Sequence, residues 1–378
     1  MTRPAARGTL LALASAMVTG CGGPGPSAAL HGEAGNGLDS TVADAVVPDG
    51  DMSEGEGIPN SGDDGVDDGD AGVLRCGSSV DGGQDGSANV ICSAEACLDD
   101  NWAQWPMPNG PADVANGAPN LETYTVNGDG TVTDDLTDLM WQQAEPAGAP
   151  TWAAAQTYCT NLTLATHSDW RLPTFIELVS IVDYSQNAPA ISPTAFPSAP
   201  GLDFWSSTPF AGALTDAREV YFSSGDTGHD GVLGTNYVRC ARGPAGTPSP
   251  AIPPARYTIG GGTVYDKKTG LTWQQTTSSE TFAWADAKAY CANTNPGVPG
   301  GWRLPTAKEL LTLVDVTRPS IPTIDCDVFV AAPAGDEWSA TPFSGFSGSS
   351  PSAWAVSFYA GNPISRAVSS LNLVRCVR

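Results

Sequence analysis

Two pairs of residues in this chain could do chemistry, and both pairs have the same spacing. Arg171 is followed six residues later by Glu177, and Arg303 is followed by Glu309. An arginine could hold the carboxylate or sulfate of a ligand, and a glutamate could act as a general acid. We expect a structural role instead, in which each arginine satisfies loop carbonyls or pairs with an acid near a helix start.

The glutamates have a structural explanation of their own. Thr174 and Glu177 form the Ser/Thr-x-x-Glu pattern of a capping box, and Thr306 and Glu309 repeat it. Pro173 prevents a helix from continuing upstream. The pattern therefore predicts a helix start, followed by a buried face that consists of Leu178, Ile181 and Val182 in one place and Leu310, Leu313 and Val314 in the other.

These stretches belong to a long internal repeat. One pentapeptide occurs twice, first as Trp170, Arg171, Leu172, Pro173 and Thr174 and again as Trp302, Arg303, Leu304, Pro305 and Thr306. We expect both copies to be structural motifs. The match extends in both directions, and a period this long indicates tandem globular domains rather than a solenoid, whose units are roughly 20–50 residues long. The other matched pairs are Trp141 and Trp273, Trp152 and Trp284, Cys159 and Cys291, Trp205 and Trp338, and Cys240 and Cys376.

The cysteines read as a disulfide framework. Nine cysteines are present, and removal of Cys21, which follows the N-terminal signal, leaves an even number. The simplest pairing lies within each repeat, Cys159 with Cys240 and Cys291 with Cys376, and each bond could contribute up to about 4.5 kcal/mol. Cys326 is expected to bond one of Cys76, Cys92 and Cys97. No CxxC occurs and the three histidines share no spacing with cysteines, so we expect no metal, no cofactor and no catalytic cysteine.

Each repeat reads as an α+β domain. A short strand begins at Tyr124 or Tyr257, and Asn127–Gly130 is a turn before a second strand. Trp152, Ala155 and Cys159 have helical spacing, which places the tryptophan and the cysteine on one buried stripe. The last third is predicted to hold strands at 205–208, 219–222 and 237–240, so that each domain has two helices and a small antiparallel sheet.

The N-terminus has the features of an export signal. Arg3 and Arg7 precede a short apolar run at Thr9–Val18, which is too short to span a bilayer. Residues 1–20 then lead into Cys21 in a sequence similar to a bacterial lipobox. This similarity implies a lipid on Cys21, and Gly22 after it favours the outer membrane, with the protein facing the cell surface or the periplasm.

Residues 21–74 are predicted to be a disordered acidic linker. Twelve acids and no lysine or arginine occur between Gly8 and Leu74, and such a segment buries too little apolar surface to fold. The aspartates at 63–70 lack the spacing of an EF-hand loop, so we expect no calcium site. Residues 75–120 are expected to be a cysteine-containing extended segment, with Trp102 and Trp105 packed on a domain.

Charge limits the possible partners. The whole chain has a formal charge of −24, and residues 121–378 hold 23 acids and 14 bases. Nucleic acid is therefore not expected as a partner, and contact with a membrane is expected only through the lipid anchor.

The shared motifs resemble those of the Lcl C-terminal domain family of exported bacterial domains, over about 124–243 and 257–378. The carrying motifs are Thr131–Asp134, Leu139–Gln142, Trp170–Thr174, Trp205–Thr208 and Val238–Cys240. The resemblance implies a C-type-lectin-like fold and a surface adhesin. The family's name-giving member binds sulfated glycosaminoglycans, but the acidic charge of these domains argues against that ligand here. The Arg-Leu-Pro-Thr-x-x-Glu segment also resembles formylglycine-generating (sulfatase-modifying) proteins.

These observations predict two tandem C-type-lectin-like domains, at 121–243 and 256–378, on a lipid-anchored cell-surface protein. We expect a binding or adhesion protein for an unknown glycan or surface protein, and not an enzyme. Trp205 and Trp338 are the candidate ligand-binding residues because aromatic faces stack on sugars, although burial in the core is the favoured alternative. The other functional hypotheses are an enzyme of the sulfatase-modifying type and a structural envelope lipoprotein.

Overall fold

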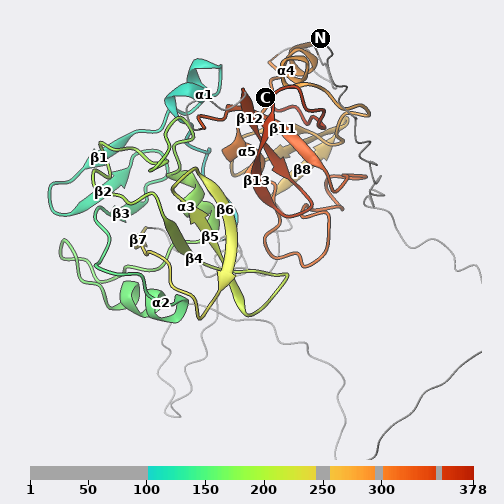
Figure 1. The fold of residues 1–378 in the computed structure, drawn as a ribbon. Helices are drawn as coiled ribbons and strands as arrows, with labels where there is room; N and C mark the ends of the chain where they lie inside the picture. Colours follow the sequence, from blue (N-terminus) through green and yellow to red (C-terminus); the bar gives the residue numbers. More distant parts are fainter. Residues whose placement is uncertain (1–100, 244–255, 294–300, 346–350) are drawn as a thin grey trace, which may run out of the picture. The chain divides into compact units, whose positions relative to one another are not determined.

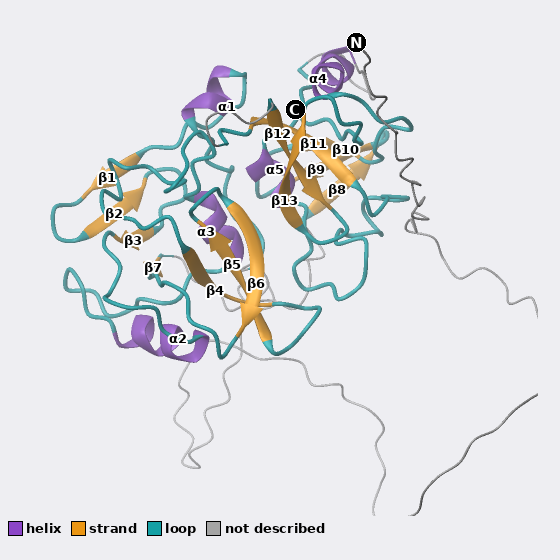
Figure 2. Ribbon diagram, viewed as in Figure 1, coloured by secondary structure: helices purple, strands orange, loops and turns teal. Residues whose placement is uncertain are grey.

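The first repeat contains two small antiparallel sheets and two helices. The computed structural model describes residues 101–243, 256–293, 301–345 and 351–378. One sheet of the first repeat has the strand order β1-β2-β3-β7 and the other has the order β4-β5-β6 (Figure 2). Its elements are β1 (Tyr124–Val126), β2 (Thr131–Asp134), β3 (Met140–Gln142), α2 (Trp152–Asn161), α3 (Phe175–Ser180), β4 (Asp203–Pro209), β5 (Asp216–Tyr221), β6 (Asp226–Gly231) and β7 (Ala241–Arg242).

Within its described residues the second repeat has the same order of elements except for β7, in whose place Val377 makes only an isolated bridge to Trp273. Its sheets have the orders β10-β9-β8 and β11-β12-β13 (Figure 2). Its elements are β8 (Tyr257–Gly260), β9 (Thr263–Asp266), β10 (Thr272–Gln274), α4 (Trp284–Asn293), α5 (Ala307–Leu311), β11 (Asp336–Pro342), β12 (Ser352–Ser357) and β13 (Asn362–Ala367). The pairing of β4 with β5 and that of β11 with β12 shift register at the same place, between the Trp and the Pro. The two repeats therefore share even their irregularities, as duplicated sequences should.

The strands in the last third of each repeat differ in part from the predicted ones. Residues 237–240 form no regular strand, since only Tyr237 makes a bridge, to Phe204. The sheet is completed instead by β6 and β13, which the sequence did not predict. β6 contains the poor strand formers Asp and Gly and β13 contains Asn and Pro, and pairing along the whole length of β5 or β12 stabilises both strands.

Helix α2 carries a narrower buried stripe than expected. Ala155 and Cys159 are fully buried, but Trp152 is half-buried and its indole Nε1 donates to the Ser206 carbonyl at 2.7 Å. Trp284 does the same with the Ser339 carbonyl at 2.7 Å. Both tryptophans therefore seal the edge of the core, and the buried face of each helix consists of alanine and cystine.

The described residues of both repeats belong to one compact unit. A single large hydrophobic cluster includes residues of both repeats, among them Phe175 and Val182 from the first and Leu310 and Val314 from the second. Lys308 of α5 is fully buried, and its Nζ donates to the Ser180 carbonyl at 2.9 Å. The repeats are thus packed together and are not independent domains on a string.

Residues 101–120 bridge the repeats. The fully buried Trp102 belongs to this segment, which also forms a short helix, α1 (Pro111–Ala115), where an extended chain was expected (Figure 1). Asn109 Oδ1 accepts a hydrogen bond from Thr306 Oγ1 at 2.7 Å, and Asn101 Oδ1 accepts one from Thr208 Oγ1 at 3.4 Å. The predicted signal 1–20, Cys21, the linker 21–74 and Cys76, Cys92 and Cys97 lie outside the described residues.

Candidate functional site

The repeated Arg and Glu form ion pairs that stabilise the scaffold. Arg171 donates to both carboxylate oxygens of Glu177, at 2.6 and 2.5 Å, and Arg303 does the same with Glu309, at 2.7 and 2.6 Å. The same carboxylates accept the backbone N–H of Thr174 at 2.8 Å and of Thr306 at 2.9 Å. Both capping boxes form. Each carboxylate is thus occupied by three structural donors and is not available as a general acid.

The leucine and the proline of each pentapeptide also contribute to the scaffold. Leu172 and Leu304 are 4% and 3% exposed, and each packs in the small hydrophobic cluster that contains the cystine of its own repeat. The Pro173 carbonyl accepts the N–H of Ser207 in β4 at 2.7 Å, and the Pro305 carbonyl accepts the N–H of Ala340 in β11 at 2.6 Å. The prolines therefore join the helix start to the sheet.

The tryptophans that begin the two pentapeptides are buried as well, since Trp170 and Trp302 are 2% and 5% exposed. Each belongs to the same cystine-containing cluster as the leucine two residues later. Every member of the repeated motif therefore has a structural contact, which supports the structural interpretation of both copies.

The hypothesis of a sugar platform at Trp205 and Trp338 is wrong. Both side chains are 0% exposed, in the strands β4 and β11. Trp205 Nε1 donates to the Pro150 carbonyl at 3.0 Å, and Trp338 Nε1 donates to the Phe282 carbonyl at 2.7 Å. The serines beside each tryptophan suggested exposure, but they lie in the middle of a strand. Neither indole can reach a ligand.

Both predicted disulfides form. Cys159 bonds Cys240 and Cys291 bonds Cys376, each with a Cα–Cα distance of 5.4 Å. Each cystine is fully buried in a small cluster with Trp170 and Trp205 or with Trp302 and Trp338. Cys326 is disulfide-bonded as well, and its partner is not among the other described cysteines.

The arginine before each terminal cysteine is part of the same scaffold. Arg375 is fully buried; its Nε and Nη2 donate to Glu337 at 3.1 and 3.0 Å, and its Nη1 donates to two backbone carbonyls. Arg239 is also fully buried, donates to the equivalent carbonyls and pairs with Glu145. Burial lowers the pKa of Arg239 to about 9. Sequence reasoning missed both roles, although the repeated Val-Arg-Cys could have indicated them.

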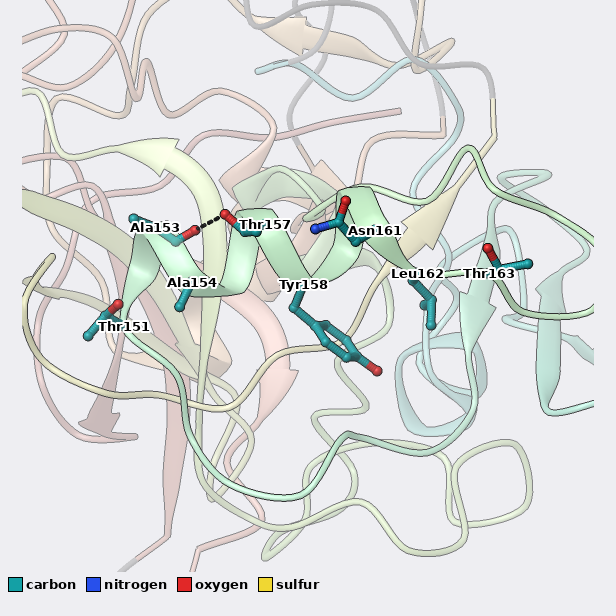
Figure 3. A pocket seen from close by; sticks show the side chains of 8 residues that line it. All are labelled: Thr151, Ala153, Ala154, Thr157, Tyr158, Asn161, Leu162 and Thr163. Atoms are coloured by element: carbon teal, nitrogen blue, oxygen red, sulfur yellow. Dashed lines mark hydrogen bonds between the residues drawn. The ribbon is translucent and has the colours of Figure 1, made fainter.

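The surface of α2 carries a wide, shallow hollow of about 800 Å³. Ala154, Tyr158 and Leu162 project from one side of the helix into it (Figure 3). None of the residues that line this hollow is charged, and the Tyr158 hydroxyl already accepts a hydrogen bond from Gln142 at 2.8 Å. The hollow offers little that could orient a ligand.

A deeper cleft, which we call the inter-repeat cleft, lies between β5 and β6 of the first repeat and two loops of the second. Its volume is about 440 Å³. It combines two arginines and a histidine with aromatic and apolar walls, a mixture that suits a small ligand. Its lining includes Phe210, Arg218, Tyr221, His229, Arg318, Ile321 and Tyr359.

Arg218 is the central polar residue of this cleft. It is 3% exposed, and its guanidinium lies over the rings of Phe175 at 5.2 Å and Phe210 at 5.3 Å. Its Nη1 donates to the Gly361 carbonyl of the second repeat at 3.2 Å, but its buried Nε has no partner among the described residues. Burial lowers the pKa of Arg218 to about 10, which leaves it charged at neutral pH.

The other cationic groups of the cleft come from both repeats. Arg318 is half-buried, and its buried Nε also lacks a partner in the described ranges. Neither Arg218 nor Arg318 forms an ion pair with a carboxylate in the described part of the chain. His229 stacks on Phe210 with ring centroids 3.7 Å apart, and its Nδ1 lies 2.9 Å from Asp216 Oδ2. The cleft therefore holds two guanidinium groups with unused donors.

A comparison with protein-family models matches both repeats to the same family. The model of the Lcl C-terminal domain matches residues 130–242 and 262–378, more than half of the chain. The chain belongs to this family. No curated protein matches the chain.

The two Lcl C-terminal domains share their scaffold residues but not the inter-repeat cleft. Every candidate chosen from the repeat came from positions that the domains have in common, and those positions build disulfides, caps and cores. Arg218 and Arg318 were missed because neither has an arginine at the matching position of the other domain. An unmatched arginine in an acidic chain was the available signal.

Metal ligands and membrane spans are both absent from the part of the chain that the structure describes. There, no group of three or more His, Cys, Asp or Glu side chains is placed to hold a metal ion. None of the helices in the described ranges has the length and apolar character needed to cross a bilayer.

Proposed function

We propose that this protein is an exported, lipid-anchored binding protein and that its two Lcl C-terminal domains are C-type-lectin-like modules. The observation that carries this proposal is the inter-repeat cleft, an open space with aromatic walls that is lined by a buried arginine without a carboxylate partner among the described residues. Disulfides, capping boxes and buried ion pairs hold the surrounding scaffold, so the cleft is pre-formed. A pre-formed cleft favours binding because little ordering entropy is lost when a ligand enters.

The two domains act as one binding unit in this proposal. Lys308 of the second domain donates to the Ser180 carbonyl of the first and pairs with Glu122, and the large hydrophobic cluster includes both domains. The ligand is a glycan or a protein of the cell's surroundings, presented to a protein that Cys21 anchors to the envelope. The disulfides support an oxidising compartment outside the cytoplasm.

Three measurements test the proposal. Growth with a labelled fatty acid should label the wild type but not Cys21→Ser, and protease treatment of whole cells should show whether the domains face outward. The full mature chain, applied to a glycan array and to an envelope extract, should retain a ligand, and Arg318→Gln should retain less of it. Absence of lipid label, or no ligand from either source, would contradict the proposal.

A count of free thiols distinguishes the binding function from the enzymatic alternative. An enzyme of the formylglycine-generating type needs a reactive thiol, whereas each cysteine in the described ranges is disulfide-bonded. Counting thiols in the denatured, unreduced mature chain should give none. One or more reactive thiols would favour the enzyme.

A further inference from the structure

The two repeats contribute corresponding residues to the contact between them. One half of this contact is closed, and the inter-repeat cleft lies at the other half. The strand registers define the corresponding positions. Trp205 pairs with Glu219 across β4 and β5, and Trp338 pairs with Ala355 across β11 and β12. The residues that precede Glu219 and Ala355 therefore correspond, and these are Arg218 and Trp354.

The closed half is built around Trp354. Its ring packs edge-on against Tyr184 of the first domain at 5.1 Å and against Phe343 at 5.0 Å. Ser344 Oγ donates to the Tyr184 carbonyl at 2.9 Å. Trp354 is 2% exposed as a result. Large aromatic side chains thus fill this half completely.

The open half has smaller or charged residues at the corresponding positions. Tyr184 follows Asp183 and Val316 follows Asp315, and in both turns the aspartate Oδ1 accepts the N–H two residues later, so Val316 stands in the place of Tyr184. Arg218 stands in the place of Trp354. Neither valine nor arginine has the aromatic ring of the residue at the matching position on the other side. The cleft of about 440 Å³ lies at this half of the contact; Arg218 lines it, whereas the buried Val316 does not.

The same comparison accounts for the second arginine. Two residues after Tyr184 the first domain has Gln186, and two residues after Val316 the second domain has Arg318. Two of the three differences between the halves of the contact thus place a guanidinium at the open one. Both arginines therefore occupy positions at which the two domains of this chain differ.

A buried guanidinium without a carboxylate is unusual for this molecule. The scaffold arginines Arg239 and Arg375 each have a buried glutamate partner, because an uncompensated buried charge is strongly destabilising. Arg218 is almost as deeply placed, but it has one carbonyl acceptor and two aromatic rings in place of an acid. Its Nε is left without an acceptor in the described part of the molecule. An anion in the cleft that Arg218 lines would give this guanidinium the counter-charge that the described residues do not provide.

We propose that the inter-repeat cleft binds a small organic carboxylate, with the carboxylate held between Arg218 and Arg318 and an apolar body against Tyr359, Ile321 and Phe210. A planar carboxylate matches the donor geometry of a guanidinium. A single negative charge fits better than a dianion, because Asp315 lies close enough to act electrostatically on Arg218 and the chain is strongly acidic. Tyr359 and Ile321 are 61% and 42% exposed at the rim, where they would be covered by the ligand.

This assignment rests on the proposed binding function, and titration calorimetry on the full mature chain tests it separately. The first probe is N-acetyl-phenylalanine, with N-acetyl-phenylalaninamide as its neutral match. The second probe is glucuronate, with glucose as its match. The first pair represents a peptide C-terminus as the source of the carboxylate, and the second represents a sugar acid. Inorganic sulfate is the third probe.

The repeat supplies the variants. Arg318→Gln copies the first domain and Arg218→Trp copies the second, so both replace a residue by one that the related position already accepts. Arg242→Gln is the matched control, since Arg242 pairs with Asp169 at the surface away from the cleft. Circular dichroism and the thiol count report whether each variant is folded.

One carboxylate probe should bind at least about ten-fold more tightly than its neutral match, and Arg318→Gln should weaken it about ten-fold. Arg218→Trp should abolish binding and Arg242→Gln should leave it unchanged. Equal affinity for acid and neutral match, unchanged affinity in Arg318→Gln, tighter binding of sulfate, or no heat with any probe would overturn the assignment. If Arg218→Trp does not fold, Arg318→Gln decides alone. Retention of a ligand from the array or extract by a protein that fails this test would leave the proposed function standing and remove only the carboxylate site.

Discussion

Removal of the carboxylate that neutralises Arg375 should destabilise the second domain severely. The side chains of Glu337 and Arg375 are 1% and 0% exposed, and two hydrogen bonds of 3.0 and 3.1 Å join them. Glu337→Gln leaves the guanidinium buried without a counter-charge. The structure therefore predicts a loss of about 3–5 kcal/mol in the free energy of unfolding, and a fall in Tm of roughly 6–20 °C.

The neighbouring residue provides a matched control. Asp336 pairs with Arg366, but the Arg366 side chain is 40% exposed and that pair lies at the surface. Asp336→Asn should cost less than about 1 kcal/mol. Urea denaturation followed by tryptophan fluorescence measures both variants under the same conditions, with the disulfides intact.

The first domain suggests a rescue. In the first domain, Arg239 corresponds to Arg375, and it pairs with Glu145. Glu145 lies two residues after the Gln-Gln that both domains share. Phe204 occupies the position of Glu337. Thr277 occupies the position of Glu145. Glu337→Phe combined with Thr277→Glu should therefore recover at least about half of the stability that Glu337→Phe alone loses, because the buried guanidinium regains a carboxylate.

Two results would refute this reasoning. A loss below about 1 kcal/mol for Glu337→Gln would mean that the buried guanidinium does not depend on its acid. A double variant no more stable than Glu337→Phe would mean that the acids of the two domains are not exchangeable in position.

The remaining predictions concern the contact between the domains and the buried acids. Lys308→Ile, which copies the first domain, should cost about 3–5 kcal/mol because it leaves Glu122 buried and unpaired, and adding Glu122→Gln should recover part of that loss in a urea titration. Burial raises the pKa of Glu219 to about 7 and the pKa values of Asp113 and Asp226 to about 6. These carboxyls hold their protons to higher pH in the folded than in the unfolded state, so the free energy of unfolding should fall as the pH rises from about 4 to about 8. Glu219→Gln should flatten that fall; an unchanged slope would contradict the raised pKa.

The local and repeated features of this protein could be read from the sequence. The capping boxes depend on residues three apart, and the strand turn at Asn127–Gly130 depends on four consecutive residues, so short-range chemistry specifies them. The disulfide pairing came from duplication, because only cysteines at shared positions could pair in the same way in both domains. The motifs that recur in both copies also indicated the family.

The cleft was not predicted from the sequence, because the candidate residues were chosen from positions that both domains share. Trp205 and Trp338 looked like ligand-binding residues because they recur beside serines, yet recurrence marks what both domains need to fold. Arg218 and Trp354 occupy corresponding positions, but a sequence comparison does not show that both lie at one contact between the domains.

The amino-acid pattern alone specifies two cross-linked copies of one α+β domain, with caps, cystines and a buried tryptophan-rich core in each. The folded molecule is needed to see how the copies meet, which of their arginines has a buried acid and which has none, and where a space remains open. The difference lies in the distance along the chain over which each feature is set. Caps, turns and repeated cystines are fixed by neighbours along the chain or by a match between copies, whereas burial and charge compensation depend on side chains far apart in the sequence, as Arg218 and Gly361 are.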